Sequence, residues 1–315
     1  MSSAPPDIVG LGLATLDVLL RVPRMATWDD PAWVTSFGLD GGGMVGTACC
    51  AAARLGASVG FIGTAGDDLS AQMKLRSFVE CGVDLSRLVV RPGPEPNVMI
   101  VYVDEATGER IFSPLTGFAR YDVQPEALDR DYITSAQILH LDEFNRAAAL
   151  QAARWMREAG RTVCIDCSRT SSPGPVAPDL LELLGLTDVL ISGSGFLRCL
   201  TGEPDVRRAG RQALALGPRL VVETDGANGS TTITAEGDFH TPAFTVPVAD
   251  TTGAGDVFHG AYAVALLRAW EPRLAAQFAT AVSAIKCTRL GGRRGIPTLA
   301  EVATFLAERG ITLPD

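Results

Sequence analysis

The sequence predicts an α/β fold, in which a mostly parallel sheet is covered by helices and a small separate β-sheet lies beside it. Between residues 138 and 223, short apolar runs alternate with segments of helical periodicity, which is the pattern of parallel strands joined by helices. Two strand-like stretches, at 18–23 (VLLRVP) and 98–112, lie outside this alternation. They predict the small sheet, the second as a β-hairpin that turns near Thr107-Gly108.

Composition places the chain among folded globular proteins. With 315 residues, 47% of them hydrophobic and 20% charged, it is long enough to bury a substantial core. The net charge of −9 has the wrong sign for a broad nucleic-acid or membrane-binding surface. No apolar run reaches the roughly 20 residues of a membrane span, and MSSAPPD at the start lacks the features of a secretory signal. We therefore expect a cytoplasmic protein that binds neither nucleic acid nor membranes.

The individual elements follow from apolar periodicity and from helix-ending glycines such as Gly82. In the first 112 residues we expect strands at 7–13, 18–23 and 58–63, helices at 46–55 and 69–81, and the hairpin at 98–112. In the remainder we expect strands at 138–141, 162–166, 188–191 and 219–223, helices at 147–159, 178–184, 205–216, 255–269, 272–290 and 298–308, and a hairpin at 230–239. An exposed loop around Trp28 to Trp33 separates the second strand from the first helix.

The segment Asp250-Thr-Thr-Gly-Ala-Gly-Asp256, directly before the amphipathic run 257–267, carries the strongest chemical signal. Glycines at a helix start let the main chain approach a ligand, and the unpaired N–H groups there favour an anion such as phosphate. A carboxylate beside a phosphate pocket needs a role of its own, and removing the proton from an attacking hydroxyl supplies one. We therefore predict that Asp256 is a catalytic base, next to N–H groups of residues 254–256 that stabilise the transferred group.

Each glycine segment also has a purely structural alternative. Asp256 could only complement the helix dipole while Thr252 caps the helix. Gly41-Gly42-Gly43 either lets a sugar lie against bare main chain or serves tight strand-to-helix packing, and it is no P-loop because no Lys-Ser or Lys-Thr follows.

Three further segments carry weaker signals. Gly10 and Gly12 partly match a dinucleotide fingerprint, but Thr15 stands where the third glycine belongs. Asp17 beyond them is placed to accept hydrogen bonds from sugar hydroxyls, unless it is a simple turn aspartate. Cys164-Ile-Asp-Cys167 has metal-site spacing without a second pair, so two reduced thiols at a strand end explain it better. We expect His259, one turn beyond the predicted base, to have a packing or helix-surface role.

Two of these segments, GGGMVGTACCAAARLGASVGFIGTAGDD (41–68) and DTTGAGDVFHGAYAVAL (250–266), resemble in order and spacing the signatures of the ribokinase-like, or PfkB, carbohydrate kinases. The resemblance covers essentially the whole chain. It implies a ribokinase-like three-layer α/β/α sandwich with a mostly parallel central sheet. Residues 1–14, 40–96 and 115–315 would form the nucleotide-binding and catalytic core, and residues 15–39 and 97–114 a β lid over the sugar through which two copies dimerise.

The same resemblance implies an activity and a set of site residues. The γ-phosphate of Mg-ATP would pass to a hydroxyl of a small sugar, with Asp256 as base and an anion hole at Gly253, Ala254 and Gly255. Sugar contacts are implied for Asp17, Gly42, Gly43, Thr47 and Asp256. Nucleotide contacts are implied for Thr224, Gly226, Gly253, Gly255, Lys286 and Gly292. Asp250 and Thr252 match a loop that holds a monovalent cation such as K⁺ in some members.

Two positions depart from the family pattern. Thr47 replaces the asparagine of the GGxxxN pattern, which shortens the sugar contact. Ile191-Ser-Gly-Ser-Gly-Phe196 replaces the Asn-x-x-Glu motif, so magnesium would depend more on the ATP phosphates and water.

The tail KCTRLGGRRGIP (286–297) is similar to that of bacterial sulfofructose kinases and, more distantly, of ketohexokinase. Phe144 stands where that subgroup has its sulfonate-binding arginine, and Arg146 is the alternative donor. We therefore expect a ketose or related sugar as the substrate. The competing hypotheses are a catalytically silent sugar- or nucleotide-binding regulator on the same fold and, on the first glycines alone, a nicotinamide dehydrogenase.

Overall fold

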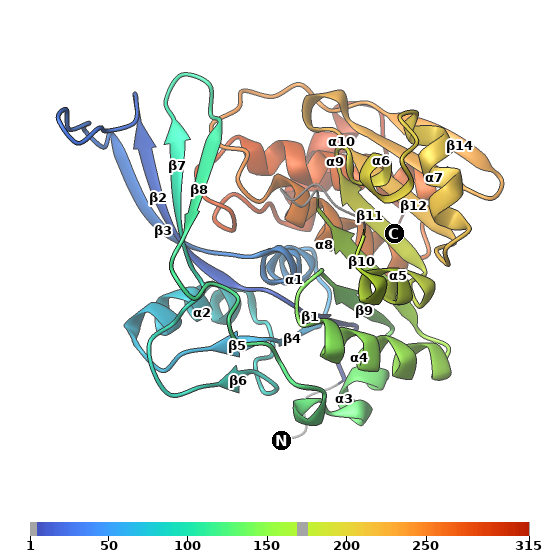
Figure 1. Ribbon diagram of the computed structural model, residues 1–315. Helices are drawn as coiled ribbons and strands as arrows, with labels where there is room; N and C mark the ends of the chain where they lie inside the picture. The colour runs from blue at the N-terminus through green and yellow to red at the C-terminus, as the bar shows by residue number, and fades with distance from the viewer. Residues whose placement is uncertain (1–4, 169–175, 315) are drawn as a thin grey trace.

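The computed structural model of the chain describes residues 5–168 and 176–314, arranged around one large sheet (Figure 1). The sheet has eight strands in the order β14 (Gly237–Thr241), β13 (Ser230–Thr234), β12 (Leu220–Thr224), β11 (Val189–Gly193), β10 (Thr162–Cys167), β9 (Ile138–Leu141), β1 (Ile8–Leu11) and β4 (Val59–Ile62). Every neighbouring pair from β4 to β12 is parallel, and only β13 and β14 at one edge are antiparallel. The predicted α/β fold with a mostly parallel sheet is confirmed.

Helices cover both faces of this sheet, because successive side chains on its buried strands point to opposite sides. One face packs against α1 (Met44–Arg54), α2 (Leu69–Cys81), α8 (Ala254–Leu267), α9 (Pro272–Cys287) and α10 (Leu299–Ala307). The other packs against α3 (Arg130–Ser135), α4 (Arg146–Glu158), α5 (Pro178–Gly185), α6 (Phe196–Thr201) and α7 (Val206–Leu214). In the part of the chain that the structure describes, no helix is both long and apolar enough to cross a membrane.

A smaller four-stranded sheet projects from the core (Figure 1). Its order is β3 (Ser36–Gly42), β2 (Thr15–Val22), β7 (Val98–Asp104) and β8 (Arg110–Pro114). Strand β3 was not expected, and neither were the short helices α3 and α6. Since β3 runs to Gly42, the glycines at 41 and 42 lie in a strand, and α1 begins only after Gly43. A parallel pair, β5 (Thr64–Ala65) and β6 (Val89–Val90), and two 3₁₀ turns, η1 (Pro125–Ala127) and η2 (Gly226–Asn228), complete the fold.

The two faces of the small sheet differ in character. The strand register aligns Leu20 with both Phe37 and Tyr102, and Tyr102 with Ile111, in one cross-strand row. Side chains alternate along a strand, so Asp17 of β2 lies on the opposite face from this row. The face opposite Asp17 therefore carries an apolar row, in which Phe37 is 62% and Ile111 53% exposed.

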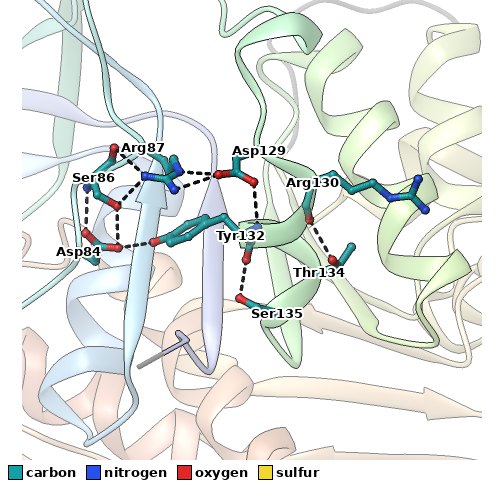
Figure 2. Close-up of polar contacts among 8 residues, drawn as sticks. All are labelled: Asp84, Ser86, Arg87, Asp129, Arg130, Tyr132, Thr134 and Ser135. Carbon is teal, nitrogen blue, oxygen red and sulfur yellow. Dashed lines mark hydrogen bonds and ion pairs between the residues drawn. The ribbon is translucent and has the colours of Figure 1, made fainter. Parts of the chain in front are cut away.

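A polar cluster fastens α3 to the segment between β4 and β6 (Figure 2). The Tyr132 hydroxyl donates to Asp84 Oδ2 at 2.7 Å, and Arg87 Nε donates to Asp129 Oδ2 at 3.0 Å. The Arg87 guanidinium also lies over the Tyr132 ring, 4.9 Å from its centroid. These contacts help to hold that end of the core together.

Candidate active site

The start of α8 presents main-chain N–H groups to its surroundings. Gly253 precedes the helix with a positive φ of 74°, which glycine adopts without strain, and it supplies no side-chain cap. The Thr252 hydroxyl is buried and has no hydrogen-bond partner among the described residues. The alternative in which Thr252 caps α8 is therefore wrong. The Ala254 amide donates to the Thr251 carbonyl at 3.1 Å, whereas the amides of Gly255 and Asp256 have no main-chain acceptor among the described residues. These two amides remain available to an anion, and the helix dipole favours one there.

Asp250 fixes the shape of this turn. Its Oδ1 accepts from the Thr252 amide at 2.8 Å and its Oδ2 from the Gly291 amide at 2.8 Å. The fully buried Lys286 donates its Nζ to the Asp250 main-chain carbonyl at 2.9 Å. Burial opposes ionisation of Asp250, but Lys286 and the two amides outweigh it and lower the pKa. The turn is thus built around an ionised carboxylate, and the hydrogen bond from Lys286 stabilises it.

A cavity of about 540 Å³ opens beside the turn and takes in Thr224, Gly226, Ala254 and Gly255. Phe244, Val246, Phe258, Ala284 and Cys287 are among its apolar lining residues. Such a mixture of apolar walls and a few polar groups suits a flat ring attached to a polar chain.

Arg110 brings a positive charge from the small sheet to this cavity. It lies on β8, lines the cavity, and donates from Nη1 to the Thr251 hydroxyl at 2.7 Å. Its charge opposes the rise in the Asp256 pKa, so it lies close enough to act on that carboxylate. The small sheet and the α8 turn therefore share one site.

Asp256 lies in the first turn of α8, directly after the exposed Gly255, and is partly buried. Burial raises the pKa of its carboxyl to about 6, and the neighbouring Asp17 adds to the rise. Arg110, Arg293 and Lys286 act in the opposite direction. A carboxylate with a pKa in this range is ionised at neutral pH and is a better proton acceptor than an ordinary aspartate.

Asp17 lies within β2 and is nearly completely buried, so it is not a turn aspartate. It accepts a hydrogen bond from the Thr15 hydroxyl at 2.6 Å. A side chain at Gly42 would overlap its carboxylate, so the glycine at that position leaves room for Asp17. Burial raises the Asp17 pKa to about 6, and Asp40 and Asp250 add to this. Asp17 and Asp256 thus come together from opposite ends of the sequence.

Gly43 and Thr47 mark the start of α1. Gly43 has a φ of 86° and packs so close to Leu13 that a side chain would lie 2.6 Å from the Leu13 carbonyl oxygen. Thr47 is fully buried, and its hydroxyl faces Arg293 Nε at 3.4 Å. The Thr47 hydroxyl is therefore engaged inside the protein rather than presented at the cavity.

The remaining nucleotide positions divide into two groups. Thr224, Gly226 and Gly255 line the cavity, whereas Gly253 and Gly292 pack against each other behind the turn, at 3.1 Å from an added Gly253 Cβ to Gly292 Cα. Together with the buried Lys286, these two glycines shape the turn rather than the cavity wall.

The segment in place of Asn-x-x-Glu contributes no free carboxylate. Glu223 of β12 lies beside it, and its two oxygens accept from the amides of Gly195 at 3.2 Å and Leu197 at 3.0 Å. Burial raises the pKa of Glu223. Glu223 therefore caps the start of α6. Any groups that bind magnesium would have to come from outside this segment.

Two further buried aspartates, Asp142 and Asp166, lie near Asp256 and were not predicted from the sequence. Burial raises the pKa of Asp166, and Asp256 and Asp142 add to the rise. His259 Nε2 lies 3.4 Å from Asp166 Oδ1, and burial lowers the pKa of this histidine. Both shifts favour uncharged forms. His259 is thus buried, which agrees with a packing role and not with a helix-surface role. The signal for Asp142 and Asp166 was their position at the ends of the predicted strands β9 and β10.

Gly10 of β1 and Gly12, directly after it, leave room for protein side chains and not for a dinucleotide. A side chain at Gly10 would overlap Cys49 and Val45 of α1, and one at Gly12 would overlap the Asp142 carboxylate and Val45. The segment that follows is the strand β2, whereas a dinucleotide fingerprint requires a helix there. Cys164 and Cys167 are buried free thiols of β10, as expected.

Comparison with known proteins agrees with this geometry. The pfkB family carbohydrate kinase model matches residues 6–299. Aminoimidazole riboside kinase of Salmonella typhimurium is 34% identical over 286 residues, covering 86% of this chain and 89% of that protein.

Two solved structures share the fold. The fructokinase of Xylella fastidiosa with bound ATP is 25% identical with a TM-score of 0.80, covering 97% of this chain and 100% of its own. The ribokinase of Arabidopsis thaliana complexed with ribose and ATP is 23% identical with a TM-score of 0.83, covering 96% of this chain and 99% of its own. The chain therefore belongs to the pfkB family of carbohydrate kinases.

Proposed function

We propose that the protein transfers the γ-phosphate of Mg-ATP to a hydroxyl of a small carbohydrate, with Asp256 as the base. The observation that carries the proposal is the turn at Gly253–Asp256. It combines the unpaired amides of Gly255 and Asp256, an adjoining cavity and a carboxylate with a pKa raised to about 6. Phosphoryl transfer needs mainly positioning and charge stabilisation, and these parts supply both.

The two substrates would approach from opposite sides of Asp256. ATP fits the cavity lined by Thr224, Gly226 and Gly255, with its phosphates toward the α8 amides and Arg110. The sugar fits the side of Asp17, Gly42 and Gly43, where the small sheet meets α1. Arg110 belongs to the site as a phosphate contact supplied by the small sheet, which on this account acts as a lid.

Magnesium would enter with ATP. It keeps several waters and binds phosphate oxygens readily, so it does not require a full set of protein ligands. A K⁺ ion at Asp250 and Thr252 stays a prediction. In the structure, the Lys286 ammonium already supplies a positive charge at this turn.

The acceptor is best sought among uncharged sugars, a ketose first. Arg146, the alternative sulfonate donor, pairs with Asp179 at 2.6 Å and donates to the Glu143 carbonyl. The pocket side of Asp256 also carries Asp17, whose charge disfavours an anionic substrate. Ribosides form the second class to test, since the Salmonella relative is named for one.

We propose further that two copies associate through the small sheet. The row of Leu20, Phe37, Tyr102 and Ile111 leaves apolar side chains on its outward face, and burial of that surface would stabilise a dimer.

The direct test of the activity is ADP formation measured over ketoses, pentoses, ribosides and sulfonated sugars. We expect ADP release that requires both Mg²⁺ and a sugar. Calorimetric sugar binding with no ADP formed over the whole panel would contradict the proposal and favour the silent regulator.

A further inference from the structure

Arg293 is a buried charged side chain that contacts several elements of the fold. It follows α9, is only 3% exposed, and lies over the Phe78 ring with Cζ 4.1 Å from the ring centroid. Its guanidinium donates to neutral acceptors on three elements: the Gly42 carbonyl of β3 at 2.5 Å, the Ser77 hydroxyl of α2 at 2.9 Å and the Thr47 hydroxyl of α1 at 3.4 Å. Burying a charge is costly, so Arg293 is held both by these acceptors and by attraction to Asp17 and Asp256, whose pKa values it lowers.

The glycines of the first signature leave room for this guanidinium. An added Cβ at Gly41 would lie 2.5 Å from Arg293 Nη1, and one at Gly46 would overlap Nη2. Thr47, shorter than the asparagine of the family pattern, accepts from Nε. Gly41, Gly46 and the departure at Thr47 are thus explained by an arginine that lies 246 residues beyond Thr47 in the sequence.

The main chain around Arg293 connects two parts of the active site. On one side, Gly291 donates to Asp250 Oδ2 and Gly292 packs against Gly253. On the other side, the Arg293 amide donates to Asp40 Oδ2 of β3 at 3.0 Å. Residues 291–293 therefore contact the turn at 250–253 on one side and strand β3 of the small sheet on the other.

We propose that Arg293 is a positioning residue that couples nucleotide binding at the α8 turn to the order of strand β3, and through β3 to the sugar side. The proposal rests on the proposed kinase function. A change at the turn moves Gly291–Gly292, and the guanidinium transmits that change to the Gly42 carbonyl because it holds β3, α1 and α2 at once. In coupling of this kind, a ligand at one site changes the binding affinity at the other, typically by about 5- to 150-fold.

The test is hydrogen exchange of the amides in 36–42, with and without Mg²⁺ and the non-hydrolysable ATP analogue AMP-PNP. In the unaltered protein we expect AMP-PNP to slow this exchange at least about fivefold. In Arg293→Met the slowing disappears while AMP-PNP still binds by calorimetry. Arg289→Ala, which removes a surface ion pair to Glu301 on the same segment, keeps the full effect.

A purely structural role gives a different result. If Arg293 only stabilises the fold, Arg293→Met would speed exchange equally with and without AMP-PNP. The slowing caused by AMP-PNP would then remain, and this result would overturn the proposal. Ser77→Ala removes one acceptor without touching either pocket, and we expect it to weaken the difference even where Arg293→Met fails to fold. If AMP-PNP slows exchange in 36–42 as much in Ser77→Ala and Arg293→Met as in the unaltered protein, the coupling is contradicted. It is also contradicted if AMP-PNP binds the unaltered protein without slowing this exchange. Absence of AMP-PNP binding in the unaltered protein contradicts the kinase function itself.

Discussion

Among single residues, the pair Asp17 and Asp256 should set the pH response of the proposed site. Burial raises the pKa of each to about 6, and the Asp17 charge adds to the rise at Asp256. The base must be ionised to accept a proton, so kcat/KM should fall about tenfold per pH unit below the apparent pKa. Because the two carboxyls interact, the profile reports values of the pair.

Asp17→Asn should move the acid limb of the kcat/KM profile to lower pH. The substitution removes a negative neighbour, which lowers the Asp256 pKa, while Arg110, Arg293 and Lys286 continue to favour the ionised form. It should also raise KM for the sugar. Asp29→Asn, on an exposed loop, serves as the control and should leave the profile in place. An acid limb that stays put or moves to higher pH in Asp17→Asn would refute this electrostatic link.

The sequence revealed some of these residues and hid others for a physical reason. Asp256 could be predicted because its glycines and the helix start are contiguous, so the proposed anion site is a local property of the sequence. Arg110 and Arg293 act through partners 141 and 251 residues away, at Thr251 and Gly42. No local pattern marks such contacts, since only the fold brings these segments together.

Between elements, the buried ion pair Lys74–Glu95 joins α2 to the segment that leads into β7. Lys74 Nζ lies 2.5 Å from Glu95 Oε2, and both side chains are completely buried. Lys74 also donates to the Thr64 carbonyl, and Glu95 accepts from the Asn97 amide, each at 2.8 Å. The pair therefore fixes the point at which the chain leaves the core for the small sheet.

Lys74→Met should destabilise the protein by about 3–5 kcal/mol, because it leaves the Glu95 charge buried without its partner. Arg76→Ala, two positions along the same helix, breaks the exposed pair with Glu80 and should cost less than about 1 kcal/mol. Urea unfolding measures both. Equal, small losses for the two variants would show that the buried pair has no special role.

Most elements were predictable because each has its own apolar period and its own end signal. The helix at 69–81 is confirmed to the residue, with Asp68 and Gly82 as its caps. Strand β3 was missed because its sequence, SFGLDGG, is poor in the residues that favour strands. Its pairing with β2, and the contacts of Asp40 and Gly42 with the Arg293 segment, hold it in place instead.

For the molecule as a whole, the outward face of the small sheet should decide the assembly state. We expect a dimer by light scattering after size exclusion, and a monomer for Phe37→Asp, which places a charge in the apolar row. Val79→Asp alters an equally exposed apolar side chain on α2 and should remain dimeric. A monomeric unaltered protein, or a dimeric Phe37→Asp, would contradict assembly through this sheet.

The proposed mechanism depends on proton transfer to Asp256 beside the unpaired amides of Gly255 and Asp256 at the start of α8. The most direct measurement is turnover of Asp256→Asn on the sugar that gives the highest ADP release, with Asp131→Asn as the control. Asp131 is an exposed first-turn aspartate of another helix, so it reports any effect of helix charge alone. We predict that kcat falls about 10²- to 10⁴-fold in Asp256→Asn while ATP and sugar still bind, and that Asp131→Asn is unchanged. Full turnover in Asp256→Asn would contradict the mechanism.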